Sequence, residues 1–232
     1  MQRLTHTHEL LDGPLPDPAL LEANLRDMAR ANRLLGGTRL SRRAVAVLAP
    51  GSELVTVLDV GTGGVDIPLA LLADARRKGR SMHVTAVDSR PEVLDAARAL
   101  HPDMATEPGL RLELADGRGL PYGTGSFDVA HASLVLHHLE EDEAVTFLQE
   151  LARVARRGIV VNDLSRGGLT VWGAWALARL TTRNRYTHHD APLSARRSYT
   201  RSEARSLVDR AGLRSVFEAN AVAGHRWVIA AV

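Results

Sequence analysis

Two glycines and the acids around them have the spacing of a nucleotide-binding turn. Gly61 and Gly63 follow an apolar run that ends at Val60, and this run predicts a strand buried on both faces. Glycine has no Cβ, so a ligand can lie against bare backbone at such a turn. The third glycine of the dinucleotide fingerprint G-x-G-x-x-G is replaced by Asp66, whose carboxylate would repel a pyrophosphate. With Asp59 just before the turn, the site suits a ligand that carries sugar hydroxyls and positive charge.

Another acid follows at the end of the next predicted strand, residues 82–88. Asp88 lies close to the position where a βαβ unit presents a carboxylate to ribose hydroxyls. A carboxylate can accept hydrogen bonds from both hydroxyls of the ribose, so Asp88 is the first candidate for this contact. The alternative is that Asp88 helps to begin the helix predicted from Pro91.

The stretch Asp59-Val60-Gly61-Thr62-Gly63-Gly64-Val65 resembles the first motif of the class I S-adenosylmethionine-dependent methyltransferases, an acid followed by x-G-x-G-x-G. The third glycine is displaced, with Gly64 one place early and Val65 in its position. The resemblance implies that Asp116, after the third strand, accepts a hydrogen bond from the adenine amino group. The alternative for Asp116 is a plain Asp-Gly turn. Ser133 ends the fourth strand, where open α/β sheets bind ligands.

The cofactor implied is S-adenosylmethionine, which becomes S-adenosylhomocysteine. The residues assigned to it are Arg33, Asp59, Gly61, Thr62, Gly63, Asp88, Ser89, Ala115, Asp116, Gly117, Ser133 and His138. Arg33 is the candidate for the cofactor's carboxylate. The alternative is that Arg33 is a solvated cation that complements the dipole at the end of its helix.

Methyl transfer to a hydroxyl group requires a base that removes the hydroxyl proton. The candidates are His138, Asp163 and His189, with His188 beside the last of these. The alternative for the histidines at 137–138 is packing against the adenine or a neighbouring helix. No metal site is predicted: without cysteine there is no cysteine metal site, and Ala132-Ser133 offers no carboxylate where metal-dependent catechol methyltransferases carry one. Magnesium stays open as the alternative, because Asn162-Asp163 has their Asp-Asn pair in reverse order.

The resemblance implies an α/β fold: a Rossmann-like, seven-stranded, mostly parallel sheet whose last strand is antiparallel. Residues 1–50 are predicted to form an N-terminal helical cap, and residues 51–232 the cofactor-binding domain, with a substrate-capping insertion at about 165–199 after the fifth strand. The sequence pattern predicts strands at 54–60, 82–88, 110–114, 127–132, 159–161, 213–220 and 225–232. It predicts helices at 19–35, 41–48, 66–78, 91–100, 140–157, 169–180 and 200–211. Asp66 is the predicted N-cap of helix 66–78, and Gly158 is predicted to end helix 140–157.

Composition narrows the class of protein. The net charge is +2, aromatic residues make up 4% and the arginines are scattered, which disfavours nucleic-acid binding. No apolar run could span a bilayer and no signal peptide is apparent, so we expect a cytoplasmic protein without a membrane partner. The expected partner is a small-molecule acceptor, and homodimer formation is left as an open alternative.

The function expected is O-methylation of an aromatic or polyketide-like small molecule. Alternatives are C- or N-methylation of a small metabolite, or a cyclase or regulator that binds the cofactor without methylating. The phrases at 32–37 and 189–197 are similar to bacterial methyltransferases of secondary-metabolite pathways, including those encoded near polyketide synthases.

Overall fold

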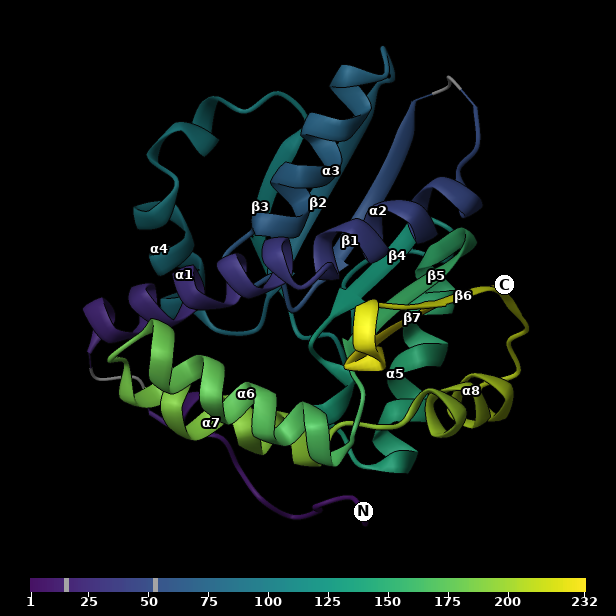
Figure 1. The fold of residues 1–232 in the computed structure, drawn as a ribbon. Coiled ribbons are helices and arrows are strands. Elements are labelled where there is room, and N and C mark those ends of the chain that lie inside the picture. The colour runs from purple at the N-terminus through teal and green to yellow at the C-terminus, as the bar shows by residue number, and fades with distance from the viewer. Residues whose placement is uncertain (15–16, 52–53) are drawn as a thin grey trace.

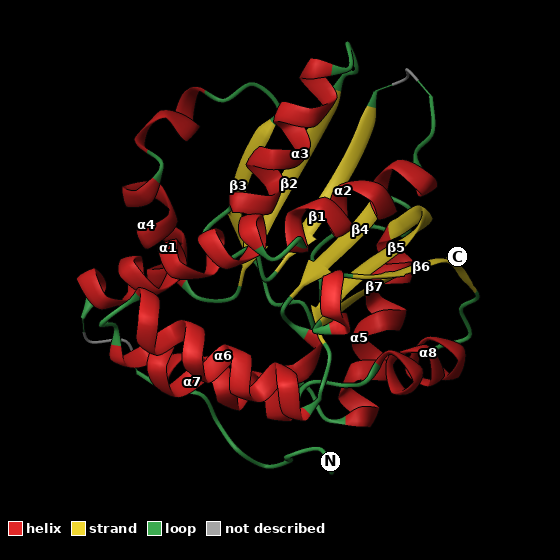
Figure 2. Cartoon of the chain, in the orientation of Figure 1, coloured by secondary structure: helices red, strands yellow, loops and turns green. Residues whose placement is uncertain are grey.

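One mixed sheet of seven strands runs through the protein, and helices cover both of its faces (Figure 1, Figure 2). The computed structural model describes residues 1–14, 17–51 and 54–232. β7 is antiparallel to both of its neighbours and the other strands run parallel to one another, which confirms the predicted Rossmann-like sheet. In spatial order the strands are β3 (Leu110–Leu114), β2 (Met82–Asp88), β1 (Val55–Val60), β4 (Phe127–Ser133), β5 (Ala155–Leu164), β7 (Arg226–Ala231) and β6 (Ser215–Asn220).

The helices form two layers. Those on one face are α2, α3 and α4, and those on the other are α5 and α8. Along the described chain the helices are α1 (Pro18–Leu34), α2 (Gly37–Leu48), α3 (Asp66–Arg77), α4 (Pro91–Leu100), α5 (Glu141–Val154), α6 (Gly168–Thr181), α7 (Arg185–Arg197) and α8 (Arg201–Arg210). Two short 3-10 turns, η1 (Leu10–Asp12) and η3 (Leu136–His138), lie near the site described below.

The core follows from the alternation of side chains along the central strand β1. Val57 points to the face that α2 and α3 cover, and Leu58 points to the face that α5 and α8 cover. Both side chains are fully buried, as expected for a parallel strand with helices on both sides. This two-sided burial fixes the register of β1, so the residues that follow Val60 are held at one defined edge of the sheet.

The junction between α5 and β5 differs from the prediction. The expected helix 140–157 ends at Val154, and β5 begins at once with Ala155, so Gly158 does not end a helix. Gly158 lies inside β5 where the pairing with β4 shifts, and its φ of +136° is a backbone conformation suited to glycine. A Cβ there would lie 2.3 Å from the carbonyl oxygen of Ala231. Glycine is therefore needed for sheet pairing.

The insertion after β5 contains two helices where the sequence predicts one. α6 matches the predicted helix 169–180, and α7 follows it as an additional helix. Its buried residues include Asp190, Ser194 and Arg197, and Pro192 lies in its interior. A buried face in which polar groups alternate with Tyr186 and Ala195 leaves no clear apolar period in the sequence, and an internal proline usually indicates a break.

α1, α6 and α7 gather at the carboxyl edge of the sheet, the end to which the parallel strands point (Figure 1). α7 contacts α1, η1 and η3. α1 and the insertion thus lie at the same edge as the glycine turn, whereas α2, which also belongs to the predicted cap of residues 1–50, packs on a face of the sheet.

α8 offers a test of local stability. The Thr200 side chain accepts a hydrogen bond from the Glu203 backbone N–H at 3.3 Å, and the Glu203 carboxylate accepts from the Thr200 N–H at 2.8 Å. This capping box satisfies two backbone donors, so Thr200→Ala is expected to lower the free energy of unfolding by about 1 kcal/mol. Urea denaturation followed by circular dichroism measures the change. Thr200→Ser retains the hydroxyl and should stay near wild type; an equal loss in both variants would contradict the cap.

Candidate functional site

The glycine turn between β1 and α3 has three residues in the left-handed region. They are Gly61 at φ +69°, Gly63 at +54° and Val65 at +61°. A Cβ on Gly61 would lie 2.5 Å from Cγ2 of Val135, so both the conformation and the close approach require glycine there. Val65 holds the place of the motif's third glycine, and positive φ is a conformational outlier for a β-branched residue. Its fully buried side chain packs in one cluster with Ala86, which explains how this conformation persists.

Asp66 begins α3 and does not cap it, so the predicted N-cap is wrong. The N-cap residue is Val65, and no side chain caps the helix. The Asp66 carboxylate accepts a hydrogen bond from Nδ2 of Asn32 in α1 at 3.0 Å. This bond connects the start of α3 to α1. Burial raises the pKa of Asp66.

Two groups at this edge have unused hydrogen-bonding capacity. Oγ1 of Thr62 is buried and has no hydrogen-bond partner, although buried hydroxyls nearly always have one. The Asp88 carboxylate ends β2 and accepts from the backbone N–H of Gly63 at 3.2 Å and of Arg90 at 3.1 Å. Each of its oxygens keeps a further lone pair for a ligand. Burial raises the pKa of Asp88 above its ordinary value.

The residues after β3 approach the sheet closely. A Cβ on Gly117 would lie 2.8 Å from atoms of both Phe147 and Val60, so its backbone lies directly against the core. Ala115 is buried before it. Asp116 is exposed and pairs with the exposed guanidinium of Arg118 at 2.7 Å, which lowers the pKa of Asp116. An adenine amino group would have to share this carboxylate with Arg118.

A buried arginine connects the ends of three strands and a helix. Arg226 begins β7 and is 3% exposed. Its guanidinium donates to Oδ1 of Asn162 at 2.6 Å, to Oδ1 of Asn32 at 2.7 Å and to Oγ of Ser133 at 2.8 Å. Ser133, predicted to face the cofactor, is thus oriented by Arg226. Burial lowers the pKa of Arg226 to about 10, so the guanidinium stays charged at neutral pH.

The hydrogen-bond network around Arg226 extends through Asn162 to Asp59, which precedes the glycine turn. Nδ2 of Asn162 donates to Oγ of Ser41 at 2.7 Å, and Ser41 lies 2.7 Å from Nε2 of His131. His131 Nδ1 lies 2.5 Å from the Asp59 carboxylate. Asp59 is 3% exposed, so the motif's acid is held inside the protein by His131. This arrangement positions the end of β1 through α2 and β4.

The helix end at residues 32–37 places a different residue in the site from the one predicted. Arg33 is exposed, as is Ser89 after β2. Asn32 is 4% exposed and bridges Asp66 and Arg226. Polar residues inside apolar strands, such as His131 and Arg226, were the available sequence signal for this network.

Glu9, His137 and Asp163 form a second cluster of polar groups, the acid–imidazole cluster, beside the network around Arg226. His137 Nδ1 is 2.8 Å from Asp163 Oδ1, and its Nε2 is 3.4 Å from Oε1 of Glu9. Burial alone would lower the pKa of His137, but the two carboxylates outweigh it and raise that pKa to about 10. The same pairing lowers the pKa of Asp163 against its burial. Asp163 is therefore held by His137 and is 1% exposed.

His138 is the more open of the paired histidines. Its side chain is 30% exposed, and its Nδ1 lies 2.9 Å from Oδ1 of Asp12. Glu9, His137 and His138 are the group among the described residues whose ligand atoms could hold a metal ion, with those atoms within 4.8 Å of one another. Arg197 Nη1 lies 3.5 Å from Glu9 Oε1, and a guanidinium there opposes a divalent cation. We interpret the cluster as ion-paired, and the absence of a metal stays a prediction.

The remaining base candidates lie on α7. His189 Nδ1 is 2.7 Å from the Asp190 carboxylate, and its side chain is half exposed. His188 Nε2 lies 2.8 Å from the carbonyl oxygen of Thr182. Both are thus engaged within or next to their own helix, while His138 lies directly after β4 in η3.

The first residues of the chain close the cluster, a feature that the sequence alone did not reveal. Arg3 donates to Glu140 and to the carbonyl oxygen of Leu139, each at 2.7 Å. Arg90 donates to the carbonyl oxygen of Gly13 at 2.8 Å. Residues 1–14 therefore run from the end of β2 to the start of α5 and carry Glu9 into the site.

Comparisons with known proteins agree with this geometry. Residues 57–158 match the family described as a methyltransferase domain. The chain is 33% identical over 129 residues to a phosphatidylethanolamine N-methyltransferase of Cereibacter sphaeroides, covering 54% of this chain and 57% of that protein. It is 30% identical over 118 residues to the ubiquinone/menaquinone biosynthesis C-methyltransferase UbiE of Geobacter sp. (strain M21), covering 50% and 48%. The chain thus spans about half the length of these curated relatives.

The likeness to solved structures extends over nearly the whole chain. A SAM-dependent methyltransferase from Aquifex aeolicus superposes with a TM-score of 0.63 at 20% identity, covering 93% of this chain and 97% of that one. At this identity the likeness establishes the fold. No helix among the described residues combines the length and apolar character needed to cross a membrane.

Proposed function

Since the chain carries a class I S-adenosylmethionine-dependent methyltransferase domain, we propose that it methylates a small molecule, and that the acceptor atom is the oxygen of an aromatic or polyketide-like compound. The observation that carries this proposal is the glycine turn beside Asp88 and a histidine–carboxylate pair at the same edge of the sheet. Relatives that methylate nitrogen and carbon make those acceptors the alternatives.

The residues present fit the cofactor. S-adenosylmethionine supplies, when bound, a methyl group on a positively charged sulfur. Gly61 and Gly63 leave bare backbone for close approach, and the unpartnered Oγ1 of Thr62 offers a polar contact. Asp88 would accept from the ribose hydroxyls, with Ser89 beside it. Ala115, Asp116 and Gly117 would hold the adenine, and Ser133 would border the reacting end. Asp59 supports the turn from within, and Asn32, not the exposed Arg33, is the residue of the end of α1 that lies beside the turn.

His138 is the base in this proposal. Its Nδ1 lies 2.9 Å from Oδ1 of Asp12, and we assign Nε2 the role of taking a proton from the acceptor hydroxyl. Asp163 orients His137 and so fixes η3, which carries both histidines. His189, half exposed on α7, is the alternative base. A hydroxyl acceptor benefits from such a base more than a neutral amine does, which favours oxygen.

The experiment is incubation with methyl-labelled S-adenosylmethionine and a panel of phenols, carboxylic acids, amines and enolisable polyketide-like compounds, read by mass spectrometry. A labelled phenol ether is the expected product. Label on nitrogen or carbon would replace the oxygen assignment. Binding of S-adenosylhomocysteine without any transfer, also with host metabolite extract, would favour a cyclase or regulator.

His138→Gln is expected to lower kcat for a phenol acceptor by about 10²–10⁴-fold, because glutamine retains polarity but takes up no proton. The affinity for S-adenosylhomocysteine should change much less. Steady-state kinetics and calorimetry measure the two. His189→Gln is the matched control and should keep its rate; the opposite pattern would move the base to His189.

A further inference from the structure

α6 presents its large apolar side chains to solvent. Leu169 is 85% exposed, Leu180 84% and Trp172 66%, and Trp175 adds to the same surface at 44%. The buried residue of this helix is Ala178. The chain's third tryptophan, by contrast, is fully buried in the core. Large apolar patches on a protein surface usually mark an interaction site, so this helix is expected to have a partner.

The charged residues of α6 and of the segments directly flanking it in the sequence are all arginines. Residues 164–189 contain four arginines and no acidic residue. The guanidinium of Arg179 lies 4.9 Å from the ring centre of Trp175, while Arg183 and Arg185 are exposed just beyond the end of the helix. Arg166 pairs with Glu203, which leaves three of the four arginines at the apolar surface. The partner that fits is therefore apolar within and negatively charged at its surface.

Contrary to the expectation of no membrane partner, which rested on the lack of a spanning segment, we propose that α6 docks this protein on the surface of a lipid bilayer that contains anionic lipids. The exposed Trp and Leu side chains of α6 would enter the bilayer at the level of the headgroups, and the arginines at and just beyond the end of the helix would reach the lipid phosphates. Tryptophan suits this position because its ring has an apolar body and a polar N–H. Since α6 has 14 residues, it lies on the bilayer and does not span it.

A second copy of the chain fits this face less well. A symmetric pairing would place α6 against α6 of the other copy. Residues 164–189 contain no acid, so the facing segment would offer the arginines no carboxylate to pair with. A bilayer with anionic headgroups satisfies the apolar and the charged groups at once.

The position of α6 explains why docking would matter. The helix packs on α7, which contacts η1 and η3, the turns that carry Asp12 and His138. The docked face thus lies at the same edge of the sheet as the site (Figure 1). A lipophilic acceptor would then reach the site from the bilayer. Docking itself is independent of the proposed methyl transfer, so the two can fail separately.

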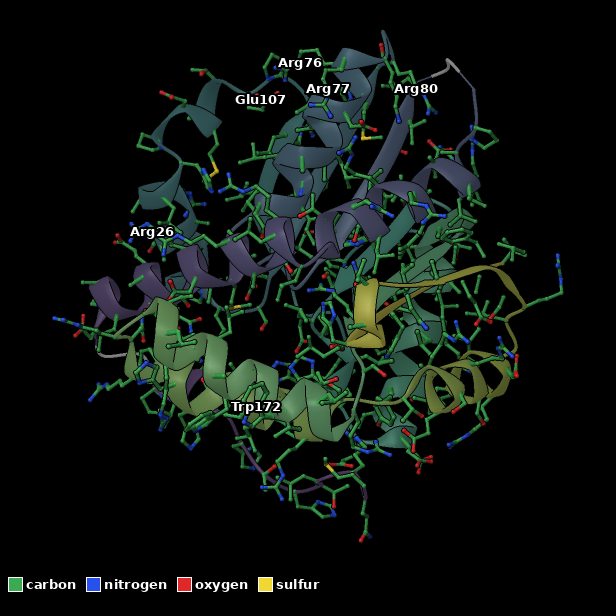
Figure 3. The ribbon with its side chains drawn as sticks, viewed as in Figure 1. Arg26, Arg76, Arg77, Arg80, Glu107 and Trp172 are labelled. Carbon is green, nitrogen blue, oxygen red and sulfur yellow. The ribbon has the colours of Figure 1, made fainter. Side chains whose placement is uncertain are left out.

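The test is flotation of the full chain with vesicles of phosphatidylcholine alone or mixed with phosphatidylglycerol. The double variant Trp172→Ser/Leu180→Ser is compared with Leu54→Ser, whose side chain is 47% exposed at the other end of the sheet. The double variant Arg183→Gln/Arg185→Gln is compared with Arg76→Gln/Arg77→Gln. Figure 3 shows that Arg76 and Arg77 lie at the end of the molecule opposite Trp172. Circular dichroism melting checks that every variant is folded.

We expect wild type to float with the mixed vesicles and to bind them at least tenfold more tightly than phosphatidylcholine alone. Loss of Trp172 and Leu180 should abolish flotation. Loss of Arg183 and Arg185 should weaken it about thirtyfold and reduce its dependence on salt. Both control variants should behave as wild type.

Three results would overturn the proposal. The first is no binding of wild type to either vesicle. The second is undiminished flotation of the folded Trp172→Ser/Leu180→Ser variant. The third is a change of oligomeric state of the Trp172→Ser/Leu180→Ser variant on gel filtration, together with no binding of wild type to vesicles. That result would show that the exposed face of α6 binds a second copy of the chain.

Discussion

Replacement of Arg226 by methionine is expected to lower the free energy of unfolding by about 3–5 kcal/mol. The change removes three buried hydrogen bonds, to Asn162, Asn32 and Ser133. It also leaves the acid Asp66 without the cation that lowers its pKa. Domains of this kind are stable by only about 5–15 kcal/mol, so the variant should unfold at a much lower urea concentration or fail to accumulate.

Two other variants separate the network from charge alone. Arg226→Lys retains a charge but not the planar fork that reaches three acceptors, so its stability should fall between wild type and the methionine variant. Arg205→Met breaks an exposed pair with Glu218 and should change stability little. Denaturation midpoints of the three variants measure this order. Equal stability of Arg226→Met and wild type would show that the network does not hold the fold.

Replacement of Asp88 by alanine is expected to weaken binding of S-adenosylhomocysteine by about 10²–10⁴-fold. Two hydrogen bonds from ribose hydroxyls to a charged carboxylate would be lost, each worth about 1.5–3 kcal/mol. Because burial raises the pKa of Asp88, wild-type affinity should also fall as the pH drops through that raised value and the carboxyl group becomes protonated. Isothermal titration calorimetry measures both effects.

The control for this variant is Asp116→Ala. Asp116 is exposed and shared with Arg118, so its removal should cost less affinity than removal of Asp88. Asp88 also accepts from the Gly63 and Arg90 backbones, so thermal melting must show that the variant keeps its fold. Unchanged affinity in a folded Asp88→Ala protein would contradict the ribose assignment.

The parts of the fold that repeat an apolar pattern could be predicted from the sequence. The central strand and the glycine turn were identified from Val57, Leu58 and the glycines, because burial on both faces leaves a continuous apolar run. α7 could not be identified in this way, since its buried face is polar and includes Asp190 and Arg197. The predicted α5–β5 junction at Gly158 is wrong, because a glycine is as common at a helix end as at an irregularity within a strand.

The site was predictable in part for a related reason. Acids at strand ends, such as Asp88 and Asp116, are found because parallel strands end at one edge. Glu9 and Arg226 were missed because their partners are distant in the chain: Arg226 bonds Asn32 across 194 positions. No local pattern encodes such a pairing, and only the fold brings the two residues together.

The attachment of residues 1–14 to distant parts of the chain bears on the order of folding. Arg3 bonds Glu140 across 137 positions, and the Leu10 backbone bonds Asp190 across 180. Closing such long loops costs conformational entropy, so we expect this segment to dock after the sheet, α5 and α7 have formed. Being attached at the periphery, it is also suited to detach by local unfolding while the core stays intact. We expect such detachment to withdraw Glu9 from His137 and to open the acid–imidazole cluster to ligands without movement of the sheet.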